Sequence, residues 1–94
     1  MKQGRHVIWT IEFSEVAIKQ LKKLDKQTRT RIFDYLENRV CTADDPRQQG
    51  KALAYNKSGL WRYRLGDYRI ICQIKDETIT VFVLSIGHRK EIYR

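Results

Sequence analysis

Several arginines in the second half of the chain could act on a phosphate group. Arg62 and Arg64 are two residues apart, Arg69 follows them, and Arg89 lies near the end. A guanidinium keeps its charge at any ordinary pH, and its planar fork of donors matches phosphate oxygens. The chemistry that these residues indicate is therefore the binding of a phosphate and the stabilisation of negative charge on it.

A hairpin predicted at Gly66-Asp67 would bring these arginines together. A two-residue turn pairs Arg64 with Arg69, and like charges directly opposite each other destabilise a sheet by a few tenths to about 1 kcal/mol. One face of the hairpin then carries Arg62, Arg64, Arg69 and Gln73. The other face carries Trp61, Tyr63, Leu65, Tyr68, Ile70, Cys72 and Ile74. Two interpretations stay open: the arginines stack and face water beside a carboxylate such as Asp67, or a bound anion completes the cluster.

The composition agrees with a folded basic protein. The chain has 94 residues, 41% of them hydrophobic, and a net charge of +8 from 19 Lys and Arg against 11 Asp and Glu. A chain of this length makes a single domain, residues 1–94. Residues 47–94 hold ten of the cations and four of the carboxylates, so most of the excess charge lies in the second half. Such a surface suits a polyanion, most often nucleic acid, or an acidic protein.

Other classes are disfavoured by the sequence. The first residues contain no apolar segment typical of a secretion signal, and the longest apolar run, Val81 to Ile86, is far too short to span a bilayer. Cys41 and Cys72 do not form a C-x-x-C pair, and together with the two histidines, His6 and His88, they do not have the spacing of a metal-ligand cluster. We therefore expect a reduced, cytoplasmic protein that binds no membrane, metal or cofactor.

The periodicity predicts the elements that position the arginines. A strand is expected over residues 6–12, and helices over 14–24 and 25–40, with Ser14 and Asp25 as N-caps. Residues 44–59 have no periodicity and are expected to form a long loop. Three strands follow, over 60–65, 68–74 and 79–86, the last of them central because it is apolar on both sides. The prediction is an α+β fold, β-α-α-β-β-β, with two helices packed on one face of a small, largely antiparallel four-stranded sheet.

The stretch from Gly59 to Tyr93, with "LWRYRLGDYRIICQI" and "VFVLSIGHRKEIY", resembles the RelE family of bacterial toxin-antitoxin toxins, within the RelE/ParE superfamily. The resemblance covers essentially the whole chain. It implies a small toxin that enters the ribosomal A site and cleaves mRNA there without a metal. It also implies a cognate antitoxin as partner, and the toxin-antitoxin complex could bind operator DNA.

The resemblance assigns roles to single residues. Arg69 in "DYRII" matches the arginine that contacts the scissile phosphate, Arg89 in "GHR" a second active-site arginine, and Tyr93 in "EIY" the tyrosine near the C-terminus. Arg62 and Arg64 stand where the best-studied members carry two lysines. An arginine cannot accept a proton, so these two positions can only bind and stabilise charge.

The expected mechanism is attack of the RNA 2′-hydroxyl on the adjacent phosphorus, with fixed cations stabilising the added charge. The general base is left open between Tyr93, His88 and a group supplied with the help of the ribosome. On strand alternation His88 points away from Arg89, so we expect it to be a substrate or surface contact rather than the base. Lys51 and Lys57 in the long loop, with Gln73, are candidate substrate contacts, although both lysines could simply be solvated.

Two other functions stay open. The same superfamily contains ParE-type toxins that inhibit DNA gyrase without a nuclease site, and there Arg69, Arg89 and Tyr93 would have no obvious task. A plain RNA-binding module is the second alternative. It is weaker, because the aromatic residues fall mostly on the predicted core face rather than on an exposed stacking platform.

Overall fold

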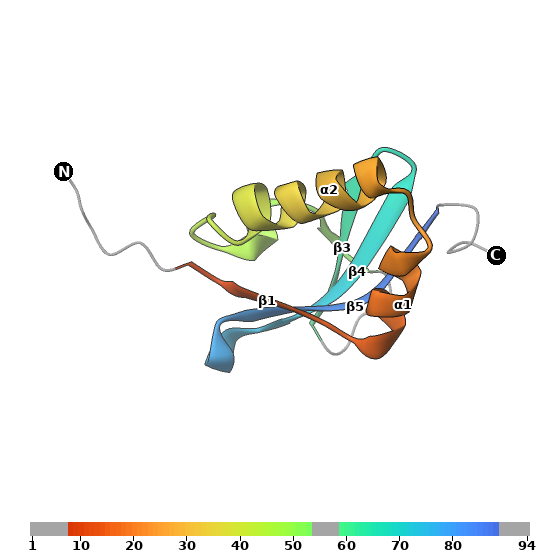
Figure 1. The fold of residues 1–94 in the computed structure, drawn as a ribbon. Coiled ribbons are helices and arrows are strands. Elements are labelled where there is room, and N and C mark those ends of the chain that lie inside the picture. The colour runs from red at the N-terminus through yellow and green to blue at the C-terminus, as the bar shows by residue number, and fades with distance from the viewer. Residues whose placement is uncertain (1–7, 54–58, 89–94) are drawn as a thin grey trace.

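The computed structural model describes residues 8–53 and 59–88 as an α+β fold, with two helices on one side of a five-stranded sheet (Figure 1). The strands are β1 (Thr10–Phe13), β2 (Lys51–Ala52), β3 (Leu60–Leu65), β4 (Tyr68–Lys75) and β5 (Thr80–His88). Their order in the sheet is β1-β5-β4-β3-β2, with β1 parallel to β5 and every other pair antiparallel. The predicted fold class is confirmed, and the sheet has one strand more than predicted.

Helix α1 (Glu15–Lys22) begins at the predicted cap. The Ser14 hydroxyl accepts a hydrogen bond from the Ala17 backbone N–H at 3.0 Å and donates to the Leu84 carbonyl of β5 at 2.7 Å. One side chain therefore both starts the helix and fastens it to the sheet. The helix ends two residues earlier than predicted, and Ala17 and Leu21 are its buried positions.

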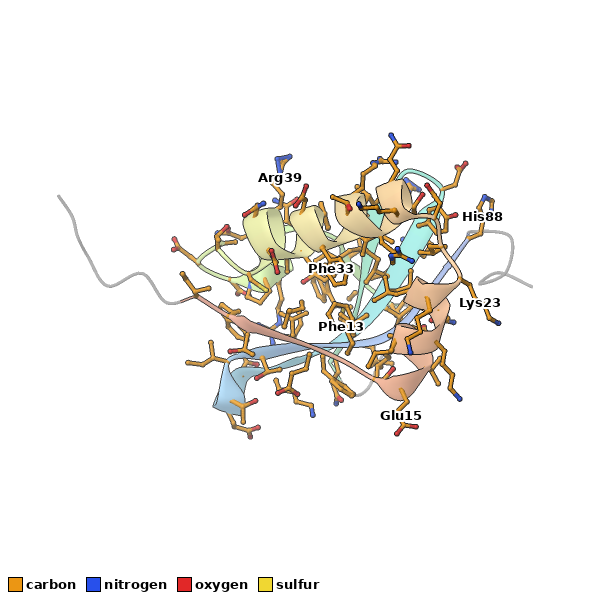
Figure 2. The ribbon with its side chains drawn as sticks, in the orientation of Figure 1. Phe13, Glu15, Lys23, Phe33, Arg39 and His88 are labelled. Atoms are coloured by element: carbon orange, nitrogen blue, oxygen red, sulfur yellow. The ribbon has the colours of Figure 1, made fainter. Side chains whose placement is uncertain are left out.

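Helix α2 (Lys26–Tyr35) also begins after its predicted cap, Asp25, whose carboxylate accepts from the Thr28 hydroxyl instead of a backbone N–H. A π-helical turn over Leu36–Val40 continues it. The predicted inward positions Ile32, Leu36 and Val40 are all fully buried. Figure 2 shows Phe33 reaching from α2 toward Phe13 of β1; the two rings meet edge to face, with centroids 5.5 Å apart.

The β3–β4 hairpin has the predicted register, with Arg64 opposite Arg69 and Leu65 opposite Tyr68. Gly66 has a φ of 61°, and Asp67 after it is not in the positive-φ region. This is the pattern of a type II′ turn, in which the first central position favours glycine. The turn fixes which side chains of the two strands share a face.

Strand β5 lies between β1 and β4, which confirms its predicted central place. It extends two residues beyond the expected end, to His88. The register shifts between Ile71 and Cys72, which pair with Ser85 and Val83, so Leu84 is the extra residue of a bulge. The buried side chains of β5 join those of the helices and the hairpin in one core: Ala17, Leu21, Ile32, Leu36, Val40, Cys41, Tyr63, Ile70, Cys72, Val81, Val83 and Ile86.

The prediction of an irregular loop over residues 44–59 was wrong for its described part. A short 3₁₀ turn, Pro46–Gln48, leads into β2, which pairs with the edge of β3. The Tyr63 hydroxyl donates to the Pro46 carbonyl at 2.8 Å, and Trp61 Nε1 donates to the Gln49 carbonyl at 2.5 Å. A two-residue strand has no periodicity to read, so only these long-range contacts define it.

The N-terminal strand begins later than predicted, at Thr10, and residues 6 and 7 lie outside the described part of the chain. Within the described residues, neither helix is long and apolar enough to cross a membrane.

Candidate active site

Arg64 and Arg69 lie side by side on the sheet face opposite the helices. Arg64 is exposed, whereas Arg69 is only 5% exposed, so the interpretation of solvated arginines is wrong for Arg69. Its Nη1 donates to the carbonyls of Gly66 and Tyr68, both at 3.3 Å. On the other side Arg69 faces Gly87 of β5, which has no side chain to compete for the space. The hairpin therefore holds one guanidinium in place beside a second, exposed one.

Lys51 and Arg62 approach the pair from the sheet edge. They are directly opposite each other on β2 and β3. Together with Arg64 they line a pocket of about 280 Å³, whose other lining residues are Tyr35, Gln49 and Gly50. Three of the cations expected to contact substrate are therefore brought together.

Sequence reasoning missed Tyr35 of α2. Its ring meets that of Tyr63 edge to face, with centroids 6.0 Å apart, and burial raises the pKa of its hydroxyl. The sequence gives no signal that distinguishes Tyr35 from an ordinary core aromatic residue, because Tyr35 stands directly before Leu36, a residue of the core.

His88 lies on the opposite face of the sheet from the arginine pair. It is opposite Tyr68 in the register, and the two rings meet edge to face with centroids 5.5 Å apart. Its Nε2 is 3.9 Å from the Asp67 carboxylate. It lines a hollow of about 480 Å³ together with Lys23, the residue that caps the C-terminal end of α1, and Figure 2 shows both side chains at the same end of the molecule. His88 is therefore separated by the sheet from Arg64 and Arg69.

The remaining predicted residues are distant or not described. Gln73 shares the face of Arg69 but lies four residues along β4, a distance of about 13 Å. Arg89, Tyr93 and Lys57 lie outside the described residues, so the roles expected of them stay predictions.

The cysteines and the possible metal ligands of the described residues do not form a second site. Cys41 and Cys72 are both buried free thiols, and burial raises the pKa of the Cys41 thiol to about 11. A thiol protonated at neutral pH is a poor nucleophile. Among residues 8–53 and 59–88, no three His, Cys, Asp or Glu side chains are grouped so that they could hold a metal ion.

Comparison with known proteins gives the family. Residues 11–93 match the model of the ParE toxin of type II toxin-antitoxin systems. Toxin RelG of Mycobacterium tuberculosis is 30% identical over 92% of this chain and 97% of its own length. The mRNA interferase toxin RelE of Escherichia coli is 30% identical over 88% of this chain and 87% of its own length. The solved toxin-antitoxin complex RelBE2 of M. tuberculosis contains a chain of the same fold, with a TM-score of 0.79 and 28% identity over 93% of this chain and 98% of its own.

These matches span nearly the whole chain, and the resemblance first noted on the C-terminal motifs is confirmed. The chain belongs to the ParE toxin family of type II toxin-antitoxin systems. Within it, the chain is a RelE-like toxin.

Proposed function

We propose that this toxin is an endoribonuclease that cleaves mRNA in the ribosomal A site and so stops translation. The observation that carries the proposal is the arginine pair, in which Arg69 is buried and oriented by two backbone carbonyls while Arg64 stays exposed beside it. The name of the E. coli relative, an mRNA interferase toxin, supports the same activity.

The reaction requires charge stabilisation that this pair can supply. The 2′-oxygen of the RNA forms a bond to phosphorus while the bond from phosphorus to the 5′-oxygen breaks, leaving a 2′,3′-cyclic phosphate and a 5′-hydroxyl. The proton of the 2′-hydroxyl passes to a base, and the leaving oxygen gains a proton. Added negative charge develops on the two non-bridging oxygens, where Arg69 and Arg64 would bind. Such donors act most strongly when they are held in place beforehand.

The resemblance matches Arg89 to an active-site arginine of the family and Tyr93 to its C-terminal tyrosine, and we propose their roles from the chemistry of the reaction. Tyr93 is the proposed base and Arg89 the cation beside the leaving oxygen. His88 is a weaker candidate for the base, because it lies on the other face of the sheet. A tyrosine needs the field of neighbouring guanidiniums to lower its pKa from about 10.

The proposed partners follow from the same relatives. The similar structures include complexes of RelE-type toxins with RelB antitoxins, and we expect this chain to bind a cognate antitoxin encoded beside it. A ribosomal target places the activity in the cytoplasm.

A reconstituted translation system with primer extension tests the proposal. We expect cuts in the A-site codon, slowed about 10²- to 10³-fold by Arg69→Ala, the loss typical of one charge-stabilising donor. Arg64→Ala should also slow cleavage, and because Arg64 is exposed, this variant guards against a loss caused by misfolding. Lys19→Ala is the control, since Lys19 is an exposed cation of α1 that lines neither of the two hollows.

Two outcomes would contradict the proposal. Inhibition of purified gyrase with intact mRNA would make the chain a ParE-type gyrase toxin. Binding of RNA without cleavage would make it a non-catalytic RNA-binding module.

A further inference from the structure

An aromatic pair on the helix-covered side of the sheet joins the ends of two strands. Tyr68 is the first residue of β4 and His88 is the last residue of β5, and the two are directly opposite each other in the register. Their rings meet edge to face, with centroids 5.5 Å apart and ring planes at 81°. Aromatic rings prefer this geometry, so the contact holds the two strand ends together.

The end of β5 depends on β4 for its position. Strand β1 ends at Phe13, which pairs with Val83, so β1 does not extend along the last residues of β5. On that side, Gln20 of α1 takes the place of a strand at one position, where its Oε1 accepts a hydrogen bond from the Ile86 backbone N–H at 2.6 Å. Beyond Ile86, β4 is the strand beside β5 in the described part of the chain. The ring pair therefore fixes the part of β5 that has the fewest other neighbours in the sheet.

The ring contact outweighs the charges around His88. Asp67 has its carboxylate 3.9 Å from His88 Nε2, but its side chain is 66% exposed and that of His88 36%. Solvent screens a pair this open, and exposed pairs contribute little. Lys23 lines the same hollow as His88 and adds a positive charge there. The packing of the two rings, rather than a charge on His88, is thus the contact that holds the strand end.

This contact bears on Arg89, which follows His88 in the sequence and which the family resemblance assigns to the active site. Arg69 is held by two carbonyls of its own hairpin, whereas Arg89 is joined to the described part of the chain through His88. We propose that His88 and Tyr68 are positioning residues for RNA cleavage: their ring contact sets where the chain leaves β5, and thereby where the Arg89 guanidinium meets the leaving oxygen. The proposal rests on the ribonuclease function proposed above.

The size of the effect follows from the contact itself. His88 lies across the sheet from Arg64 and Arg69, so its influence on the reaction would pass through the backbone rather than through the RNA. A displacement of about 1 Å in a catalytic group can slow a reaction as much as 10²-fold. One edge-to-face contact, however, biases two alternative placements by only about 2- to 12-fold. We therefore expect losses of that smaller size.

Single-turnover cleavage in the reconstituted translation system tests the proposal, at a temperature where circular dichroism shows every variant to be folded. His88→Ala and Tyr68→Ala should each lower the maximal rate about 2- to 12-fold and leave the toxin concentration for half-maximal rate unchanged. His88→Phe and Tyr68→Phe keep a ring at each position and should restore most of this loss. Lys23→Gln is the matched control, because it removes a charge from the same hollow and keeps both rings.

A double variant separates positioning of Arg89 from a general loss of structure. In an Arg89→Ala chain, His88→Ala should cause no further loss of rate, because the guanidinium that the ring contact positions is absent. A merely structural role would slow both backgrounds equally.

Four outcomes would overturn the proposal. These are wild-type rates in both alanine variants, an undiminished effect of His88→Ala in the Arg89→Ala chain, a loss in Lys23→Gln as large as that in His88→Ala, and equal losses in His88→Ala and His88→Phe. The last of these would make His88 the general base. If the wild-type chain cut no mRNA, the ribonuclease function itself would fail, and this proposal with it.

Discussion

Gly50 allows the sharpest test of how the pocket is built, because the chain offers a matched control. Gly50 and Gly59 both have a φ of +75°, so an alanine at either site suffers the same left-handed backbone strain. They differ in their surroundings. At Gly50 the new methyl group would lie 2.4 Å from the Arg62 carbonyl oxygen, whereas at Gly59 the nearest atom among the described residues is the Ile74 carbonyl oxygen at 4.0 Å.

The shared strain costs about 1–2 kcal/mol of unfolding free energy. The lower backbone entropy of the unfolded alanine chain offsets part of it equally in both variants. The clash in Gly50→Ala adds about 1–3 kcal/mol, the usual cost of overpacking, because a backbone oxygen cannot rotate away. In a domain of this size 1 kcal/mol corresponds to roughly 4–8 °C in Tm. Gly50→Ala should therefore melt about 4–24 °C below Gly59→Ala.

Thermal unfolding followed by circular dichroism measures this difference on the two purified variants and the wild type. At a temperature where it is folded, Gly50→Ala should also bind RNA more weakly than Gly59→Ala, measured by fluorescence anisotropy with an uncleavable RNA oligonucleotide, because Lys51 and Arg62 are no longer held opposite each other. Equal melting temperatures for the two variants would refute the packing argument.

Two further predictions concern stability. Ser14→Ala should lower the free energy of unfolding by about 1–2 kcal/mol, or roughly 4–16 °C in Tm, because the Ser14 side chain caps α1 and bonds to β5. Asp25→Ala should cost less stability, since the Asp25 side chain makes no capping hydrogen bond to α2. Equal losses for the two variants in calorimetry would contradict this. Arg47 lowers the pKa of Asp76, so this carboxylate stabilises the fold above its ordinary pKa of about 3.9 and stops doing so as the pH falls through the lowered value. Asp76→Asn should accordingly melt below the wild type at pH 7, with a gap that closes in acid, and a gap independent of pH would count against the ion pair.

The sequence was sufficient for the features that local patterns encode. The alternation on either side of Gly66-Asp67 predicted the hairpin register, and with it the pairing of Arg64 and Arg69. Ser14 and Asp25 marked both helix starts. Capping and strand alternation depend on residues close together in the chain, which is why they could be read directly.

Features set by distant contacts could not be predicted in this way. Strand β2 exists because Gly50 fits against β3 and because Trp61 and Tyr63 bond the segment before it. Alternation assigned Arg69 to a face but gave no sign that it would be buried there, bonded to the carbonyls of its own hairpin. Tyr35 joins the pocket only through packing of α2 on the sheet.

The place of β5 has a consequence for how the toxin is made. Thr10 of β1 pairs with Thr80 of β5, so the ribosome must add 70 more residues after Thr10 before its partner in the sheet has been synthesised. At synthesis rates of ~5–20 residues per second the delay is roughly 4–14 s. Contacts this far apart in sequence raise the contact order of the fold, and the complete sheet cannot form until β5 has been made. A nascent chain that stops before β5 lacks a middle strand of its sheet, so we expect it not to fold into a working toxin.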